Sequence, residues 1–126
     1  MASKQKGLVE FLKQEVGDKL RAVGKYDKDG YDILYIRDDA ADQFSQSDIE
    51  DIHHEMVLKG LGNQRIESLF NNDNLDCSIY QFDDKIRLHF VHEDYRGTYV
   101  SFDFDGEVNP SKIVEECKQI VESSEE

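Results

Sequence analysis

Two aspartates in the stretch KYDKDGYDILYI, residues 25–36, have the spacing that opens a calcium-binding loop. In such a loop Asp27 takes position 1 and Asp29 takes position 3. The glycine required at position 6 would then be Asp32, and an aspartate would replace the bidentate glutamate at position 12. Gly30 follows Asp29 as it does in a two-residue hairpin turn. The stretch therefore predicts a β-hairpin and no dedicated calcium site.

The four histidines lack a metal-binding spacing. His53 and His54 are adjacent, so on a helix they point about 100° apart, and the i, i+4 spacing of helical zinc sites is missing. His89 and His92 are three apart on a predicted strand, which sends them to opposite faces. We predict no metal site and expect these histidines to be partly exposed on solvated faces.

The two cysteines, Cys77 and Cys117, fall within apolar patterns and are interpreted as small buried residues. A cysteine nucleophile needs a neighbouring base and an electropositive pocket, which neither pattern provides. Carboxylate pairs carry little information about acid–base catalysis in a chain with 28 acidic residues. Phosphate-binding, dinucleotide-binding and nucleophile-elbow motifs are missing. We predict no catalytic residue and no cofactor, and we expect the protein not to be an enzyme.

The net charge of −13 restricts the partners of this chain. A surface this negative repels phosphates, which argues against nucleic acids and anionic membranes. One interpretation is an acidic coat that keeps the protein soluble at high intracellular salt. The other is a patch that steers the protein towards a basic partner. Acids scattered along the whole chain favour the coat, although ten of the 15 basic residues are lysines, which fits an extreme halophile less well.

The length of 126 residues predicts one domain over 1–126, with an acidic tail frayed over 122–126. No apolar run approaches the roughly 20 residues of a membrane span. The N-terminal residues MASKQKG contain no apolar signal region. We therefore expect a cytosolic protein.

Apolar periodicity in the first half of the chain predicts a helix followed by a hairpin. The predicted bounds are 4–16 for the helix and 20–26 and 31–37 for the strands. Asp29 and Gly30 are predicted to form a type I′ turn, in which both residues have positive φ. That turn pairs Tyr26 with Ile33. Both faces of the hairpin then carry apolar residues, which predicts that both faces are covered.

A second amphipathic helix follows the hairpin. Ser47 and Glu50 have the spacing of a capping box, and Gly60 and Gly62 predict the end of the helix. Asn63 is predicted to cap a shorter helix. The buried stripe of the longer helix consists of Ile49, Ile52, Met56 and Val57.

The second half of the chain predicts three strands and a closing helix. The strand bounds are 75–82, 85–92 and 97–104. A turn at Asp83 and Asp84 pairs the first two strands, and Asn109 before Pro110 is predicted to cap the last helix. This turn predicts five cross-strand pairs, which are Cys77–Phe90, Ser78–His89, Ile79–Leu88, Tyr80–Arg87 and Gln81–Ile86.

The predicted order is therefore α-β-β-α-(short α)-β-β-β-α, an α+β fold with a single five-stranded antiparallel sheet. The early helix, the hairpin RAVGKYDKDGYDILYI, the helix through SDIEDIHHEM and the helix after NPSKIVEEC together resemble the roadblock/dynein light chain family. Profilin-like and longin-like folds share much of this order. LVEFLKQEVGDKLRAV, ILYIRDD and LDCSIYQF also resemble small acidic uncharacterised proteins of haloarchaea, a resemblance that implies salt adaptation and no particular chemistry.

One face of the C-terminal strands provides the candidate site, because it carries aromatic and basic side chains that are enriched in interface cores. Its candidate interface residues are Tyr80, Phe82, Arg87, His89 and Tyr99. The alternative is that the middle helix covers this face within the same molecule. In roadblock-like proteins a middle helix and an edge strand form a homodimer, which the resemblance implies here.

The function predicted from these observations is a non-catalytic cytosolic module, homodimeric, that binds another protein. A small-molecule sensor with a ligand held between sheet and helix is the first alternative, and an unrecognised minor enzyme is the second. A deep apolar pocket between the sheet and the middle helix would favour the sensor. A flat aromatic patch repeated across a two-fold axis would favour the protein-binding module.

Overall fold

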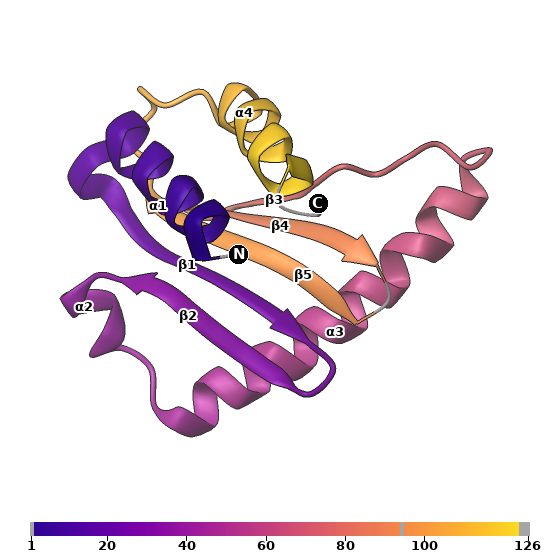
Figure 1. The fold of residues 1–126 in the computed structure, drawn as a ribbon, viewed down its shortest axis with the longest axis horizontal. Coiled ribbons are helices and arrows are strands. Elements are labelled where there is room, and N and C mark those ends of the chain that lie inside the picture. The colour runs from indigo at the N-terminus through magenta and orange to yellow at the C-terminus, as the bar shows by residue number, and fades with distance from the viewer. Residues whose placement is uncertain (1, 94, 124–126) are drawn as a thin grey trace.

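A computed structural model describes residues 2–93 and 95–123 of the chain, and Figure 1 shows its fold. The order of elements predicted from the sequence is confirmed, with one antiparallel sheet and helices on both of its faces. The elements are α1 (Ala2–Val16), the 3-10 turn η1 (Gly17–Lys19), β1 (Leu20–Asp27), β2 (Gly30–Ile36), α2 (Asp38–Ala41), α3 (Gln46–Leu69), β3 (Ser78–Gln81), β4 (Lys85–Glu93), β5 (Arg96–Asp103) and α4 (Pro110–Ser123).

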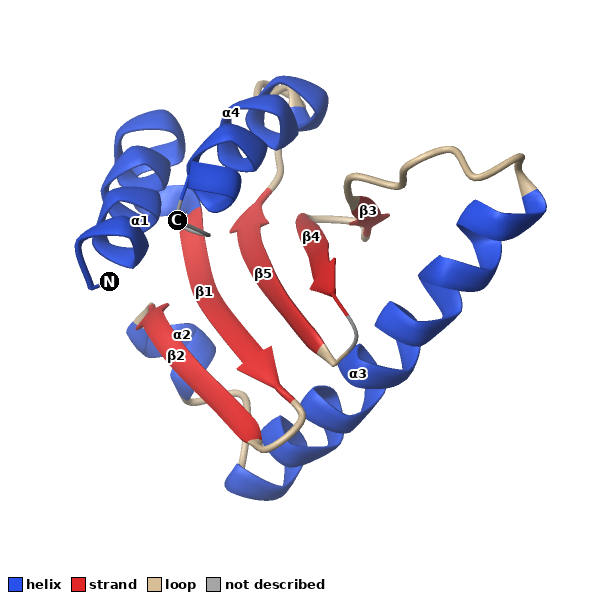
Figure 2. Ribbon diagram, turned by 45° about the vertical axis from the view of Figure 1, so that its right-hand side comes forward, coloured by secondary structure: helices blue, strands red, loops and turns tan. Residues whose placement is uncertain are grey.

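The five strands lie in the order β2-β1-β5-β4-β3, so the N-terminal hairpin and the C-terminal meander join through the β1–β5 pair. Helices α1 and α4 lie together against one face of the sheet, whereas α3 crosses the other face (Figure 2). The C-terminal part of α3 extends beyond the strands (Figures 1 and 2). The two faces are therefore covered very differently, by two helices on one side and by a single diagonal helix on the other.

The main hydrophobic core lies between the sheet and the α1–α4 pair. Period-2 alternation in the strands and the helical stripe of α4 supply it, as the sequence predicts. Its largest fully buried members are Leu12, Leu20, Val23, Ile86, Leu88, Val100, Phe102 and Cys117. Asn109 caps α4, because its side-chain oxygen accepts hydrogen bonds from the backbone N–H groups of Ser111 and Lys112.

The turn of the first hairpin differs from the predicted type I′ turn. The loop residues are Lys28 and Asp29, and Tyr26 lies opposite Tyr31, not Ile33. The Asp27 carboxylate accepts hydrogen bonds from the N–H groups of Asp29 (2.8 Å) and Gly30 (3.1 Å). This side-chain turn needs no positive φ, and none of the turn residues has one.

A β-bulge in the same hairpin shifts the register by one residue. The irregularity lies between Val23 and Gly24, with Gly24 opposite Ile33 and Val23 opposite Tyr35. Strand β1 is buried on both faces, but β2 is an edge strand and Ile33 is 43% exposed. The expectation that the whole hairpin is covered thus holds for β1 alone.

Helix α3 begins and ends at different residues from those predicted. Its capping box consists of Ser45 and Asp48, not Ser47 and Glu50. The helix also runs through Gly60 and Gly62 to Leu69, so no separate helix begins at Asn63. Gly60 belongs inside the helix because α3 approaches the sheet closely there.

The contacts at Gly60 show how close this approach is. A Cβ at Gly60 would lie 3.3 Å from the Tyr26 hydroxyl and 3.6 Å from Val91. Glycine therefore lets the helix backbone come near the sheet at this point. Further along α3, the side-chain amide of Asn63 donates a hydrogen bond of 3.5 Å to the Ser78 hydroxyl on β3. This bond is a second contact between the helix and the sheet.

The last helix reaches the end of the described residues. Helix α4 continues to Ser123, and residues 124–126 of the tail that was predicted to fray over 122–126 lie outside the described part. Within the described ranges, no helix has both the length and the apolar character needed to cross a membrane.

Candidate functional site

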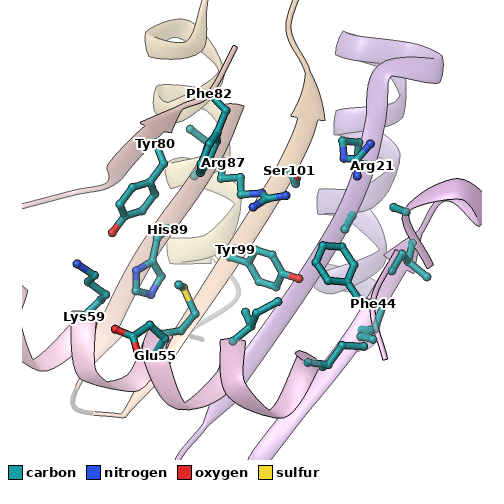
Figure 3. Close-up of a pocket in the computed structure, with 18 residues that line it drawn as sticks. Arg21, Phe44, Glu55, Lys59, Tyr80, Phe82, Arg87, His89, Tyr99 and Ser101 are labelled. Carbon is teal, nitrogen blue, oxygen red and sulfur yellow. The ribbon is translucent and has the colours of Figure 1, made fainter. Parts of the chain in front are cut away.

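A pocket of about 230 Å³ lies between the sheet and α3 (Figure 3). Its wall is mostly apolar and is built from the helix, from the loop before it and from the strands. The apolar residues that the helix and loop contribute are Phe44, Ile49, Ile52 and Met56. Three of the four residues in the stripe predicted to bury one face of the middle helix, Ile49, Ile52 and Met56, therefore line one wall of a cavity, whereas Val57 does not.

The floor of the pocket consists of small side chains on neighbouring strands. Ala22 on β1 lies directly opposite Ser101 on β5, and both residues are buried. Ala40 of α2 adds a third small residue to the lining. Because protein interiors are otherwise close-packed, this run of small residues under a helix leaves the cavity open.

The register of the C-terminal meander brings the five candidate residues together, as Figure 3 shows. Tyr80 pairs with Arg87, which pairs in turn with Ser101, and His89 pairs with Tyr99. Four of the five pairs predicted between β3 and β4 are found in the structure, whereas Cys77 precedes β3 and does not pair with Phe90. The fifth residue, Phe82, lies at the edge of the pocket and is 48% exposed.

Tyr99 reaches the middle of the pocket because its neighbour on β1 is Gly24. A Cβ at Gly24 would lie 2.9 Å from Cε1 of Tyr99, so any larger residue would displace the ring. Burial raises the pKa of the Tyr99 hydroxyl, and the positive charge of Arg87 opposes this shift. Tyr99 is therefore a protonated phenol that can donate a hydrogen bond within the pocket.

His89 is almost fully buried, with 1% of its surface exposed, which corrects the expectation of a partly exposed histidine. Its Nε2 lies 2.8 Å from the Tyr26 hydroxyl, and Nδ1 has no hydrogen-bond partner. Burial lowers the pKa of His89 to about 4, with a smaller contribution from the neighbouring His92. The imidazole is therefore neutral at physiological pH.

Tyr26 determines which nitrogen of His89 carries the proton. Burial raises the pKa of Tyr26 to about 12, and its hydroxyl donates to the carbonyl oxygen of Met56 at 3.3 Å. Nε2 of His89 then donates to the Tyr26 oxygen, which leaves Nδ1 as a hydrogen-bond acceptor.

Arg87 projects into the pocket between Tyr80 and Ser101 (Figure 3). Its guanidinium carbon lies 5.0 Å from the centre of the Phe82 ring, within the range of a cation–π contact. Burial lowers the pKa of Arg87, and the nearby Arg21 lowers it further. The hydroxyl of Ser101, whose residue is 3% exposed, has no hydrogen-bond partner.

A cluster of charged residues next to the pocket was not predicted from the sequence. Arg21 is 3% exposed, donates to Gln43 at 2.8 Å and lies 3.6 Å from Asp103. Arg37 also bonds Asp103, at 2.8 Å, and forms a second ion pair with Asp39. The only sequence signal was an arginine inside an otherwise apolar strand, a pattern that requires a buried acidic partner.

The other residues considered for chemistry have structural roles. The Asp27 carboxylate closes the hairpin turn, and His53 donates from Nε2 to the Asp27 carbonyl oxygen at 2.7 Å. Cys117 is buried and Cys77 is partly buried, and burial raises the pKa of each thiol to about 12. Among the described residues, no group of three or more His, Cys, Asp and Glu side chains is arranged to hold a metal ion.

The arrangement is suited to binding. The pocket offers apolar surface, one partly buried guanidinium, two phenols, a hydroxyl and a neutral imidazole. None of its lining residues is a cysteine or lysine activated by burial, and the lining serine has no hydrogen-bonded base. Enclosure with a few convergent polar groups is typical of small-molecule sites.

Comparison with known proteins places the chain in a family. No curated protein matches it. A family described as Domain of unknown function (DUF7522) matches residues 6–122, which span every strand of the sheet. The chain therefore belongs to the DUF7522 family.

Proposed function

We propose that this protein binds a small apolar molecule in the pocket between the sheet and α3, and so works as a ligand-binding sensor or regulatory domain. The observation that carries the proposal is the 230 Å³ cavity at the position where the sensor alternative requires one. A cavity of about 150 Å³ admits benzene, so this pocket encloses about nine non-hydrogen atoms of a ligand.

The pocket floor supports a binding role over a packing role. Ala22 and Ser101 are small residues in the centre of a sheet, where larger side chains would fill the space under α3. The unpartnered Ser101 hydroxyl and His89 Nδ1 are costly to bury in an empty apolar site. A bound molecule that fills the space and bonds these atoms accounts for both features.

The test uses indole, a neutral bicyclic molecule of the expected size, with binding measured by calorimetry and by ligand-observed NMR. Small ligands of this kind gain about 0.5 kcal/mol per non-hydrogen atom, so we expect a Kd of roughly 1 mM or tighter. Ala22→Leu fills the floor of the pocket and should weaken binding at least tenfold. It should also raise the Tm of the free protein.

Ala41→Leu is the matched control, because Ala41 is exposed on α2 and does not line the pocket. This variant should bind indole like the wild type. Unchanged binding in Ala22→Leu, or no binding to the wild type at any attainable concentration, contradicts the proposal.

The second candidate is the protein-binding module predicted from the sequence, with a second copy of the chain as its first partner. The feature that favours it is the exposed apolar surface at the C-terminal end of α3. Leu69 is 60% exposed and Phe70 is 64% exposed, beyond the part of α3 that covers the sheet. Exposed apolar groups of this size are typical of interaction surfaces.

Sedimentation at micromolar protein tests the dimer. A dimeric wild type and a monomeric Leu69→Glu variant are expected. A wild type that sediments as a monomer rules out the dimer and leaves the pocket proposal untouched.

A further inference from the structure

We infer that the ligand of this pocket is an apolar carboxylic acid, whose carboxylate is bound by the Arg87 guanidinium and the Ser101 hydroxyl. This inference rests on the proposed function, because it names the chemical class of molecule that the same pocket takes. It follows from the charges, the unpartnered polar atoms and the volume of the site.

Arg87 differs from three other arginines of the chain in its ion pairing. Arg21, Arg37 and Arg96 each lie within ion-pair distance of a carboxylate. Among the described residues, none provides a carboxylate within 4.0 Å of Arg87, although the chain contains 28 acids. A partly buried guanidinium that faces a pocket without a counter-ion is a site for an anion.

Ser101 supplies a second donor next to this guanidinium. It lies directly opposite Arg87 across the β4–β5 pair, and both side chains line the pocket. Because the Ser101 hydroxyl is buried without a partner, an acceptor on the ligand would remove the cost of leaving it unpaired. A carboxylate has two oxygens, so it can accept from the guanidinium and from the hydroxyl together.

The charges around the pocket also select an anion. Three basic residues line it, Arg21, Lys59 and Arg87, against a single acidic one, Glu55, and of the three Arg21 already pairs with Asp103. Glu55 is exposed on α3, across the pocket from Arg87 (Figure 3). The two sides of the pocket therefore differ in charge. The positive charge of Arg87 lies on the strand side, where Ser101 is buried, and the negative charge of Glu55 lies on the helix side.

The rest of the cavity sets the size and polarity of the ligand body. The helix and loop wall is apolar, and the enclosed volume holds about nine non-hydrogen atoms. A compact aryl or short alkyl group attached to one carboxylate fits this description. A larger acid would exceed the volume of the pocket. A second charge on the ligand would lie against the apolar wall, where burying it costs free energy.

The experiment compares phenylacetate with phenylacetamide, which have the same shape and differ in charge. Both are titrated against the full-length wild type by calorimetry at low salt, with indole as the neutral reference. We expect phenylacetate to bind at least tenfold more tightly than phenylacetamide, because only the acid places a full negative charge against the guanidinium. This preference should fall as salt is added.

Variants assign the preference to residues. Arg87→Met keeps an apolar chain of similar length and should abolish the preference for the acid while indole still binds. Ser101→Ala should weaken phenylacetate binding more than indole binding. Arg65→Met is the matched control, since Arg65 is exposed on α3 and does not line the pocket. A thermal melt of each variant establishes that it is folded.

The outcomes separate the two proposals. Equal binding of acid and amide to the wild type, or an Arg87→Met variant that still prefers the acid, overturns the carboxylate inference while indole binding upholds the pocket. If none of the three compounds binds, the pocket proposal fails and the carboxylate inference fails with it.

Discussion

The buried histidine predicts a specific loss of stability in mild acid. In the unfolded chain His89 takes up a proton near its ordinary pKa of 6.5, whereas in the fold it stays neutral down to about pH 4. The unfolded state therefore binds more protons between these two values, and stability falls as the pH drops through that window. Above about pH 6.5 this contribution to stability is fully present.

The size of the loss follows from the two pKa values. A tenfold change in a protonation equilibrium corresponds to about 1.4 kcal/mol, so the whole window is worth about 3 kcal/mol. At about pH 5 the expected loss is about 2 kcal/mol. With 1% of the residue exposed, solvent screening reduces this figure little. A domain of this size has about 5–15 kcal/mol of stability in total, so the loss is measurable.

The assay is urea unfolding of the wild type and His89→Gln between about pH 7.5 and pH 5. Glutamine does not titrate, and its amide can still bond the Tyr26 hydroxyl that contacts His89. The carboxylates titrate in both proteins, so the difference between their pH profiles isolates His89. His54→Gln is the matched control, because His54 is exposed on α3. Parallel pH profiles for wild type and His89→Gln would refute the reasoning.

Three further predictions follow from particular contacts and from the charge. Gly97→Ala should destabilise the protein by about 1–3 kcal/mol in urea unfolding, because a Cβ at position 97 would lie 2.6 Å from the Phe90 carbonyl oxygen. An unchanged midpoint of urea unfolding would contradict this expectation. Gly62→Ala should stabilise it by about 1 kcal/mol in the same assay, because Gly62 lies inside α3 with open space around it. The net charge of −13 predicts that Tm rises by roughly 5 °C between dilute and molar KCl, and a Tm independent of salt would contradict the acidic-coat interpretation.

Local patterns were sufficient to predict most of the register of the β3–β4 hairpin. Alternation with period 2 sets Ile79 against Leu88 and Tyr80 against Arg87, and a one-residue slip would have turned apolar side chains to the wrong face. Asn109 before Pro110 also identifies the start of α4, because a cap and a proline act within a few residues.

One feature that sequence patterns missed is local, and the others depend on contacts between distant residues. The Asp27 carboxylate closes its own turn and so changes the register of the first hairpin. Gly60 was predicted to end a helix, but it lies inside α3, where the helix approaches Tyr26. Tyr26 comes 34 residues earlier in the chain. The pocket itself depends on three segments, because Ala22 and Ser101 leave space only when α3 crosses above them.

The five candidate residues lie together around the pocket, but the sequence does not determine what covers them. Coverage by α3 is incomplete, because the helix comes close to the sheet at Gly60 and leaves a cavity over the small residues of the floor. A simple intramolecular core would place larger apolar side chains at Ala22 and Ser101, since an unfilled cavity costs about 24 cal/mol per Å³.

The same pocket contains Arg87, which has no carboxylate within ion-pair distance among the described residues, and the Ser101 hydroxyl, which has no hydrogen-bond partner among them. Each of these features lowers the stability of the free protein, and all of them lie within one pocket. A ligand that fills the cavity and accepts hydrogen bonds from both groups would reverse these costs together and stabilise the fold in proportion to its concentration over its Kd. The coincidence of cavity, unpaired cation and unpaired hydroxyl therefore supports a binding site over a defect in the core.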